Sequence, residues 1–229
     1  MIDLTRPVSA RWRVLGPLAG LVALAGCASQ GSSQRQVSDE QVLVERAAHT
    51  VSVMRSSAGT KLVDLLPKAK AVVIFPDMIK GGIGLGASHG DGVLVARTQQ
   101  GWSDPAFYTS TSISLGIQIG MEESAVVMLV MTDKALQTLL QPSSFTLKAQ
   151  GGLALADLNT ASQAELSGAD VIVWSKSEGA FGGLALAGSD IAQNTDDDRA
   201  YYGQKVMASD IIAGKVSNPG ADVLKKALA

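Results

Sequence analysis

The stretch Ser112-Ile113-Ser114-Leu115-Gly116-Ile117-Gln118-Ile119 decides the fold class. Apolar residues alternate with small or polar ones along its whole length, and this is the period of a β-strand with one buried face. The alternation predicts that Ile113 and the apolar residues that follow it face the core. Ser112 and its alternates are expected to form a small, polar face.

Other strand signals flank this stretch. Residues 71–75 form an apolar run closed by Pro76, and residues 125–131 form a second apolar run. Glycine-rich residues 81–88 and apolar residues 93–97 predict a hairpin with a Gly/Asp turn at 89–92. Gln99-Gln100-Gly101 predicts another turn, and later strands are expected at 145–150, 153–158, 171–175 and 180–187.

Helix signals lie at both ends of the predicted domain. Ser38 predicts the cap of a helix with apolar residues at helical spacing up to Gly59, and a short turn is expected before Pro67. Thr132 predicts the cap of a helix through Leu140. The other expected helices cover 204–213 and a last segment opened by Asn218 and Pro219. The predicted class is α+β, with antiparallel strands in a curved sheet or barrel-like core and flanking N-terminal and C-terminal helices.

The single cysteine, Cys27, follows Leu24-Ala25-Gly26 at the end of a short apolar run. Basic residues precede that run, which is too short to span a hydrocarbon core of about 30 Å. The pattern resembles the lipobox of bacterial lipoproteins, which implies acylation of Cys27 and cleavage before it. Residues 1–26 are then a lipoprotein signal peptide, 27–37 a lipidated cysteine and flexible tether, and 38–229 one domain.

The formal net charge is −2, so no global basic field indicates a nucleic-acid partner. The glycine-rich 86–90 stretch fits the letters of a G-x-S-x-G nucleophile elbow, but a strand and not a helix is expected after it. Residues 196–198 are three consecutive aspartates, which we expect to form a solvated acidic turn rather than a calcium loop. No catalytic residue, metal site or cofactor is predicted.

Six sequence blocks, in order, resemble the SYLF family, also called the Ysc84 type. They are Lys68-Ala69-Lys70-Ala71-Val72-Val73-Ile74-Phe75-Pro76, Gly82-Ile83-Gly84 with Gly92-Val93-Leu94-Val95, Trp102-Ser103-Asp104-Pro105-Ala106-Phe107, Gly116-Ile117-Gln118-Ile119-Gly120, Ser175-Lys176-Ser177-Glu178-Gly179-Ala180-Phe181-Gly182-Gly183, and Tyr202-Gly203. The resemblance covers about residues 38–214 and implies a lipid-binding domain. One segment departs from it: where the family often shows Ala-Gly-Pro-x-Gly-Arg, this chain has Ala156-Asp157-Leu158-Asn159-Thr160-Ala161.

The stretch from Arg46 to Lys80 is locally basic in an acidic protein, and the resemblance attributes lipid binding to a similar amino-terminal region. The candidate lipid-binding residues are Arg55, Lys61, Lys68, Lys70 and Lys80. The alternative is an ordinary amphipathic helix packed on a sheet, with its lysines in water.

The sequence thus predicts a non-catalytic lipoprotein of the bacterial outer membrane, anchored through Cys27 and facing the periplasm. Its domain is expected to bind anionic lipid head groups. A structural or protein-interaction module of the envelope, with an envelope protein as partner and no specific lipid ligand, is the alternative function.

Overall fold

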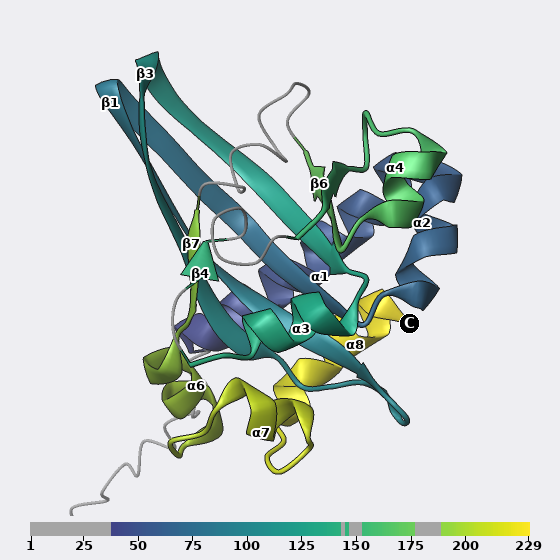
Figure 1. The fold of residues 1–229 in the computed structure, drawn as a ribbon. Helices are drawn as coiled ribbons and strands as arrows, with labels where there is room; N and C mark the ends of the chain where they lie inside the picture. Colours follow the sequence, from purple (N-terminus) through teal and green to yellow (C-terminus); the bar gives the residue numbers. More distant parts are fainter. Residues whose placement is uncertain (1–37, 143–144, 147–152, 177–188) are drawn as a thin grey trace, which may run out of the picture. The chain divides into compact units, whose positions relative to one another are not determined.

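The computed structural model describes residues 38–142, 145–146, 153–176 and 189–229. The helices are α1 (Asp39–Ser57), α2 (Gly59–Leu65), α3 (Asp133–Leu139), α4 (Gln163–Gly168), α6 (Thr195–Tyr202), α7 (Ala208–Ile212) and α8 (Asp222–Leu228), with short 3₁₀ helices η1 (Leu66–Lys68) and η2 (Pro219–Ala221). The strands are β1 (Ala71–Thr98), β2 (Gly101–Trp102), β3 (Ala106–Val130), β4 (Phe145–Thr146), β5 (Leu155–Asp157), β6 (Val171–Ser175) and β7 (Asp190–Gln193) (Figure 1). The α+β class is therefore confirmed.

One sheet joins the seven described strands. Its path is β2-β1-β3-β6-β5, with β7 pairing to β3 and β4 pairing to β7. Every described pair is antiparallel except β5 with β6. The sheet is curved (Figure 1), and among the described strands its two ends do not pair with each other. The curved-sheet expectation is confirmed, and the sheet is open.

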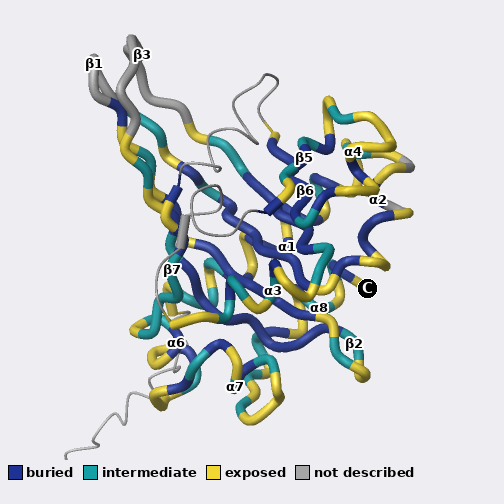
Figure 2. The backbone as a smooth tube through the Cα atoms, in the orientation of Figure 1, coloured by how far each residue is buried: buried dark blue, intermediate teal, exposed yellow. Residues whose placement is uncertain are grey.

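Strand β1 doubles back on itself. The N–H of Arg97, near its end, donates to the carbonyl of Lys70, just before its start, at 2.7 Å. A methyl group at Gly92 would overlap the ring of Phe75, so these residues also lie against each other. Figure 1 shows β1 and β3 running side by side, and Figure 2 shows both strands buried where they cross the middle of the molecule; their register shifts between Ile83 and Leu85.

A hairpin was expected in this part of the sequence, but the predicted place of its turn is wrong. Residues 89–92 lie inside the returning half of β1, where Gly90 and Gly92 allow close approach of the first half. Pro76 does not end the first strand either. It lies at a register shift between Phe75 and Met78, where its missing N–H removes no regular ladder bond.

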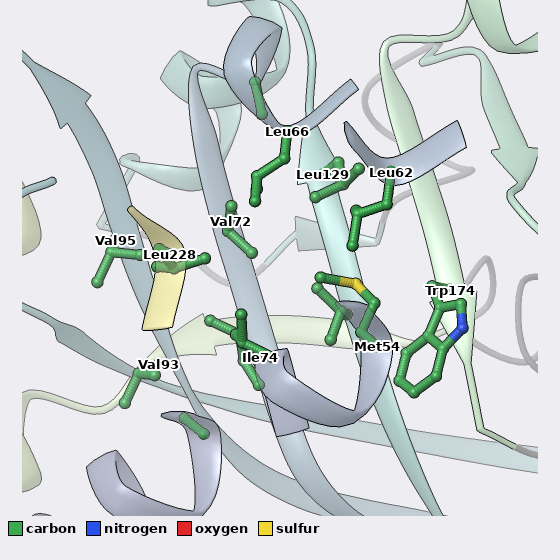
Figure 3. Close-up of a cluster of buried hydrophobic side chains, with 14 of the residues drawn as sticks. Met54, Leu62, Leu66, Val72, Ile74, Val93, Val95, Leu129, Trp174 and Leu228 are labelled. Carbon is green, nitrogen blue, oxygen red and sulfur yellow. The ribbon is translucent and has the colours of Figure 1, made fainter. Parts of the chain in front are cut away.

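The sheet is buried on both faces, which explains the continuous apolar runs at 71–75 and 125–131. One face packs against α1, α2 and α8 through Val72, Ile74, Val93, Val95 and Leu129 (Figure 3). The other face packs against α3 and α7 through Ala71, Val73, Phe75, Leu94 and Met128. The sheet is therefore the middle layer between two sets of helices.

The alternating stretch at 112–119 lies within β3 and its backbone is extended, as predicted. Ile113, however, is 80% exposed, so its expected place in the core is wrong among the described residues. Ser112 is partly buried, and its hydroxyl lies 2.6 Å from that of Ser88. The other apolar side chains of this stretch lie outside the described residues.

The predicted helix starts are largely confirmed. Ser38 and Thr132 accept N-cap bonds in α1 and α3, and Asn218 caps η2, whose first residue is Pro219. Gly59, at a φ of 60°, separates α1 from α2. The helix expected at 204–213 is the shorter α7, which follows a left-handed Gly203.

Three short elements were not predicted: α4, β7 and α6. The strand expected at 153–158 is β5, and the strand expected at 171–175 is β6. Only residues 145–146 of the strand expected at 145–150 are described, and the strand expected at 180–187 lies outside the described residues. None of the helices in the described part of the chain is long and apolar enough to cross a membrane.

Candidate functional site

Arg55 lies in the last turn of α1, beside the end of α8. Its Nη2 donates to the backbone oxygens of Leu228 and Ala229 at 3.1 and 2.7 Å. These bonds hold the exposed guanidinium against the end of α8.

Lys61, on α2, reaches the segment that departs from the SYLF pattern. Its Nζ donates to the carbonyl oxygens of Leu158 and Ala161 at 3.4 and 3.3 Å. Lys61 thus ties α2 to the turn after β5. Its charge remains uncompensated by these two contacts.

The other three predicted residues differ from one another. Lys68 ends η1 and is exposed, whereas Lys70 forms an ion pair with Asp133 at 3.2 Å. Lys80 pairs in register with Glu122 on β3. It lies ten residues along the extended β1 from Lys70, so roughly 33 Å separates their backbones at 3.3 Å per residue.

Arg55, Lys61 and Lys68 thus lie on the consecutive elements α1, α2 and η1, whereas Lys80 lies further along β1. The structure adds Lys226, an exposed residue in the last turn of α8, two residues before the carbonyl that Arg55 binds. The sequence contains the pair Lys225-Lys226, but only the packing of α8 on α1 places Lys226 near the end of α1 that carries Arg55. We call Arg55, Lys61, Lys68 and Lys226 the basic end; Asp64 on α2 is the acidic residue nearest to them in the chain.

The sequence block 102–107, which carries part of the family resemblance, is buried throughout. The indole N–H of Trp102 donates to the carbonyl of Leu228 at 3.1 Å, and the Arg97 guanidinium lies 4.1 Å from the Trp102 ring centroid. Asp104 accepts from the Asn218 N–H at 2.7 Å and pairs with Lys225 at 2.8 Å. This segment joins the sheet to α8, and Trp102, Ser103 and Asp104 also line a pocket of about 380 Å³ beside α7.

The closing Tyr202-Gly203 block meets the same segment. The Tyr202 hydroxyl donates to the carbonyl of Pro105 at 2.6 Å, and the rings of Tyr201 and Phe107 lie 5.1 Å apart. Burial raises the pKa of Tyr202 well above its usual range, with Asp104 adding to the effect. Two blocks of the resemblance, nearly one hundred residues apart, thus serve packing.

The aspartate run at 196–198 is not the solvated turn that the sequence predicted. It is the first turn of α6, and Asp198 is fully buried. Its carboxylate accepts from the Phe107 N–H at 2.9 Å and from Gln193 Nε2 at 2.6 Å. Burial raises the pKa of Asp198 to about 6, although these two bonds oppose the rise. Sequence reasoning missed this role, because the partner Phe107 lies 91 residues away and neither β7 nor α6 was predicted.

The glycine-rich 86–90 stretch does not form a nucleophile elbow. Ser88 lies within β1, and His89 contacts Asp91 at 3.6 Å and not Ser88. Within the described ranges, no group of three or more His, Cys, Asp or Glu side chains could hold a metal ion. Cys27 lies outside the described residues.

A groove that the sequence did not predict lies between α1 and the sheet. We call it the α1 groove; its volume is about 800 Å³, and its lining residues are Val42, Glu45, Arg46, His49, Thr50, Val53, Pro76, Asp77, Glu123, Ser124, Ala125 and Lys176. Arg46 and Asp77 form an ion pair across it at 2.6 Å. Its residues come from α1, β1, β3 and the residue after β6, so no local motif could reveal it.

Comparison with known proteins identifies the family. A sequence model of the Ysc84 family, described as "Las17-binding protein actin regulator", matches residues 111–229. The human SH3 domain-containing YSC84-like protein 1 is 30% identical over 159 residues, which cover 68% of this chain and 46% of that protein. LAS seventeen-binding protein 3 of Saccharomyces cerevisiae is 29% identical over 164 residues, which cover 69% of this chain and 36% of that protein.

The chain thus spans less than half the length of the curated relatives it matches. No solved structure matches it. The model match covers more than half of the chain and includes most of β3, with β6, α6, α8 and the Tyr202-Gly203 block. The chain belongs to the Ysc84 family.

Proposed function

We propose that this protein is a non-catalytic, membrane-anchored binding module whose basic end engages anionic lipid head groups. The observation that carries the proposal is the charge of the basic end. Lys61 uses carbonyl oxygens as partners, and Lys68 and Lys226 are exposed. Three lysine charges therefore remain available, and each is worth about 1 kcal/mol near an anionic surface.

The anchor proposed for this module is Cys27. Acylation there would hold the domain at the bilayer, so that weak head-group contacts persist through high local concentration. By analogy with enterobacterial sorting, Ala28 after the cysteine favours the outer membrane, with the domain in the periplasm. Labelling with a clickable palmitate tests this step. Label on the native chain and none on Cys27→Ser is expected; equal label on both rejects the anchor.

The basic end is tested by sedimentation of the purified chain with vesicles of phosphatidylglycerol. The double variant Lys68→Glu/Lys226→Glu should bind at least tenfold more weakly, because two attractive charges become repulsive. Neither side chain makes a hydrogen bond or ion pair among the described residues, so folding should be unaffected.

The matched control is Lys205→Glu/Lys215→Glu, which changes the total charge equally. Lys205 lies between α6 and α7, and Lys215 forms an exposed pair with Asp210 at 2.7 Å. This control should bind like the native chain. If both double variants lose binding equally, net charge and not the basic end controls the interaction.

The second candidate is a protein-interaction module with no specific lipid ligand. The family description, which names Las17 binding, favours it. The two candidates separate cleanly: a chain that fails to sediment with phosphatidylglycerol vesicles, yet binds a purified envelope protein, supports the second.

A further inference from the structure

The helix side of the α1 groove carries three polar side chains on one stripe. Arg46, His49 and Thr50 are three and four residues apart, the spacing of neighbours on a helix surface. Arg46 is about half exposed and His49 is exposed, whereas Thr50 is only 5% exposed. This wall thus offers a guanidinium and an imidazole beside the Thr50 hydroxyl.

The sheet side of the groove places a cation next to carboxylates. The N–H of Lys176 donates to the carbonyl of Ala125 at 3.1 Å, so Lys176 continues β6 along β3. Glu123 pairs in register with Ile79, two residues after Asp77 on β1. Lys176, Asp77 and Glu123 therefore come from three adjacent strands and face the same groove.

Thr50 has an unused hydroxyl. A threonine within a helix commonly bonds the carbonyl four residues earlier, as Thr138 does to Lys134 at 2.9 Å. Thr50 makes no hydrogen bond with any residue that the structure describes. Among the described residues, the Ser110 hydroxyl is the one that is both fully buried and unpaired, so the unpaired Thr50 hydroxyl is open to the groove and can bond a ligand there.

The charges of the groove select the kind of ligand. Two permanent cations, Arg46 and Lys176, face three carboxylates, those of Glu45, Asp77 and Glu123. A purely anionic ligand would meet a net negative site, and a purely cationic ligand would meet Arg46 and Lys176. A ligand with both signs of charge matches both sets.

The groove also has the size and apolar surface for part of a lipid. Pockets for small ligands usually hold about 300–1,000 Å³, and this groove holds about 800 Å³. Val42, Val53, Pro76 and Ala125 line it among the polar groups, and Val42 is 41% exposed.

We propose that the α1 groove binds a phosphoethanolamine group, either on a phospholipid or free. Arg46 keeps several N–H donors beyond the one that contacts Asp77, and these, with Lys176 and the Thr50 hydroxyl, hold the phosphate. Glu123 accepts from the ammonium. The site is separate from the basic end and does not rest on the function proposed above.

The test is calorimetric titration of the full chain, in a detergent without phosphate, with glycerophosphoethanolamine. Glycerol phosphate and glycerophosphocholine serve as comparison ligands, because the first lacks the ammonium and the second has no N–H to give Glu123. We expect glycerophosphoethanolamine to bind at least fivefold tighter than either. Equal affinity for the three ligands, or no binding, overturns the proposal.

Two variants locate the site. Thr50→Val keeps the side-chain shape and removes the hydroxyl, and Glu123→Gln removes one exposed charge; each should weaken glycerophosphoethanolamine binding at least fivefold. Thr138→Val, on α3, is the matched control and should bind like the native chain. If Thr50→Val and Glu123→Gln both bind glycerophosphoethanolamine with the native affinity, the proposed site is wrong.

Vesicles identify the source of the head group. If phosphatidylethanolamine vesicles compete with the soluble ligand, the group belongs to a membrane lipid; if they do not, the site takes the free compound. Lys68→Glu/Lys226→Glu should leave glycerophosphoethanolamine binding unchanged. The proposal for the α1 groove and the proposal for the basic end can therefore be rejected independently.

Discussion

The 102–107 segment and the basic end both present polar and charged groups to the end of α8, yet they use them in opposite ways. In the 102–107 segment the donors of Trp102 and the acceptors of Asp104 are buried and paired within the protein. In the basic end the three lysines are exposed and have no carboxylate partner among the described residues. The blocks of the resemblance therefore differ from one another: 102–107 builds the scaffold, whereas the first block also places Lys68 at the surface.

The largest effect is expected from Trp102→Ala. This change removes a buried ring, its stacking with Arg97 and its bond to Leu228, so the free energy of unfolding should fall by about 3–5 kcal/mol. Urea unfolding measures it. Lys226→Ala, on the same α8 surface, is the control and should change stability by less than about 0.5 kcal/mol. A small loss for Trp102→Ala would mean that the segment is not a scaffold.

The pH dependence of stability tests whether Asp198, which accepts from the Phe107 N–H of the 102–107 segment, is buried as a carboxylate. Its pKa is about 6 in the folded protein and close to 4 when unfolded, so the folded state binds the proton more tightly. Stability should therefore rise as the pH falls from 7.5 to 5, by about 1 kcal/mol, because protonation removes a buried charge. The pKa of Asp197 is also raised by burial and adds in the same direction.

Asp198→Asn should lose most of this rise, since the amide has no charge to bury. Thermal unfolding of both proteins between pH 5 and 7.5 provides the measurement. An equal rise in both proteins would show that Asp198 is already protonated, or solvated, at neutral pH.

The smallest stability effect is expected at the basic end. Lys68→Gln and Lys226→Gln should each change the free energy of unfolding by less than about 0.5 kcal/mol, because both side chains are exposed. Their effect should appear in vesicle sedimentation instead. A loss above about 1 kcal/mol would place these lysines with the scaffold.

Local patterns predicted much of the fold. The caps at Ser38, Thr132 and Asn218 depend on a few neighbouring residues, and the apolar runs at 71–75 and 125–131 depend on burial of both sheet faces. The hairpin turn was misplaced because Gly90 and Gly92 indicate a turn in the sequence but serve close strand packing in the structure. Ile113 shows that a period of two reveals a strand without fixing which face is covered.

The candidate site was harder to predict because it is assembled from distant residues. Arg55, Lys61 and Lys68 were found as a local basic run, but Lys226 joins them only through the packing of α8 on α1. Lys80 belongs to the same run in the sequence, and the extended β1 carries it away. The α1 groove depends on four separate elements.

Sedimentation with phosphatidylglycerol vesicles measures head-group binding by the basic end. The native chain and Lys205→Glu/Lys215→Glu should sediment equally, while Lys68→Glu/Lys226→Glu should bind at least tenfold more weakly with unchanged stability. Native binding by Lys68→Glu/Lys226→Glu would contradict the claim that the basic end engages anionic lipid.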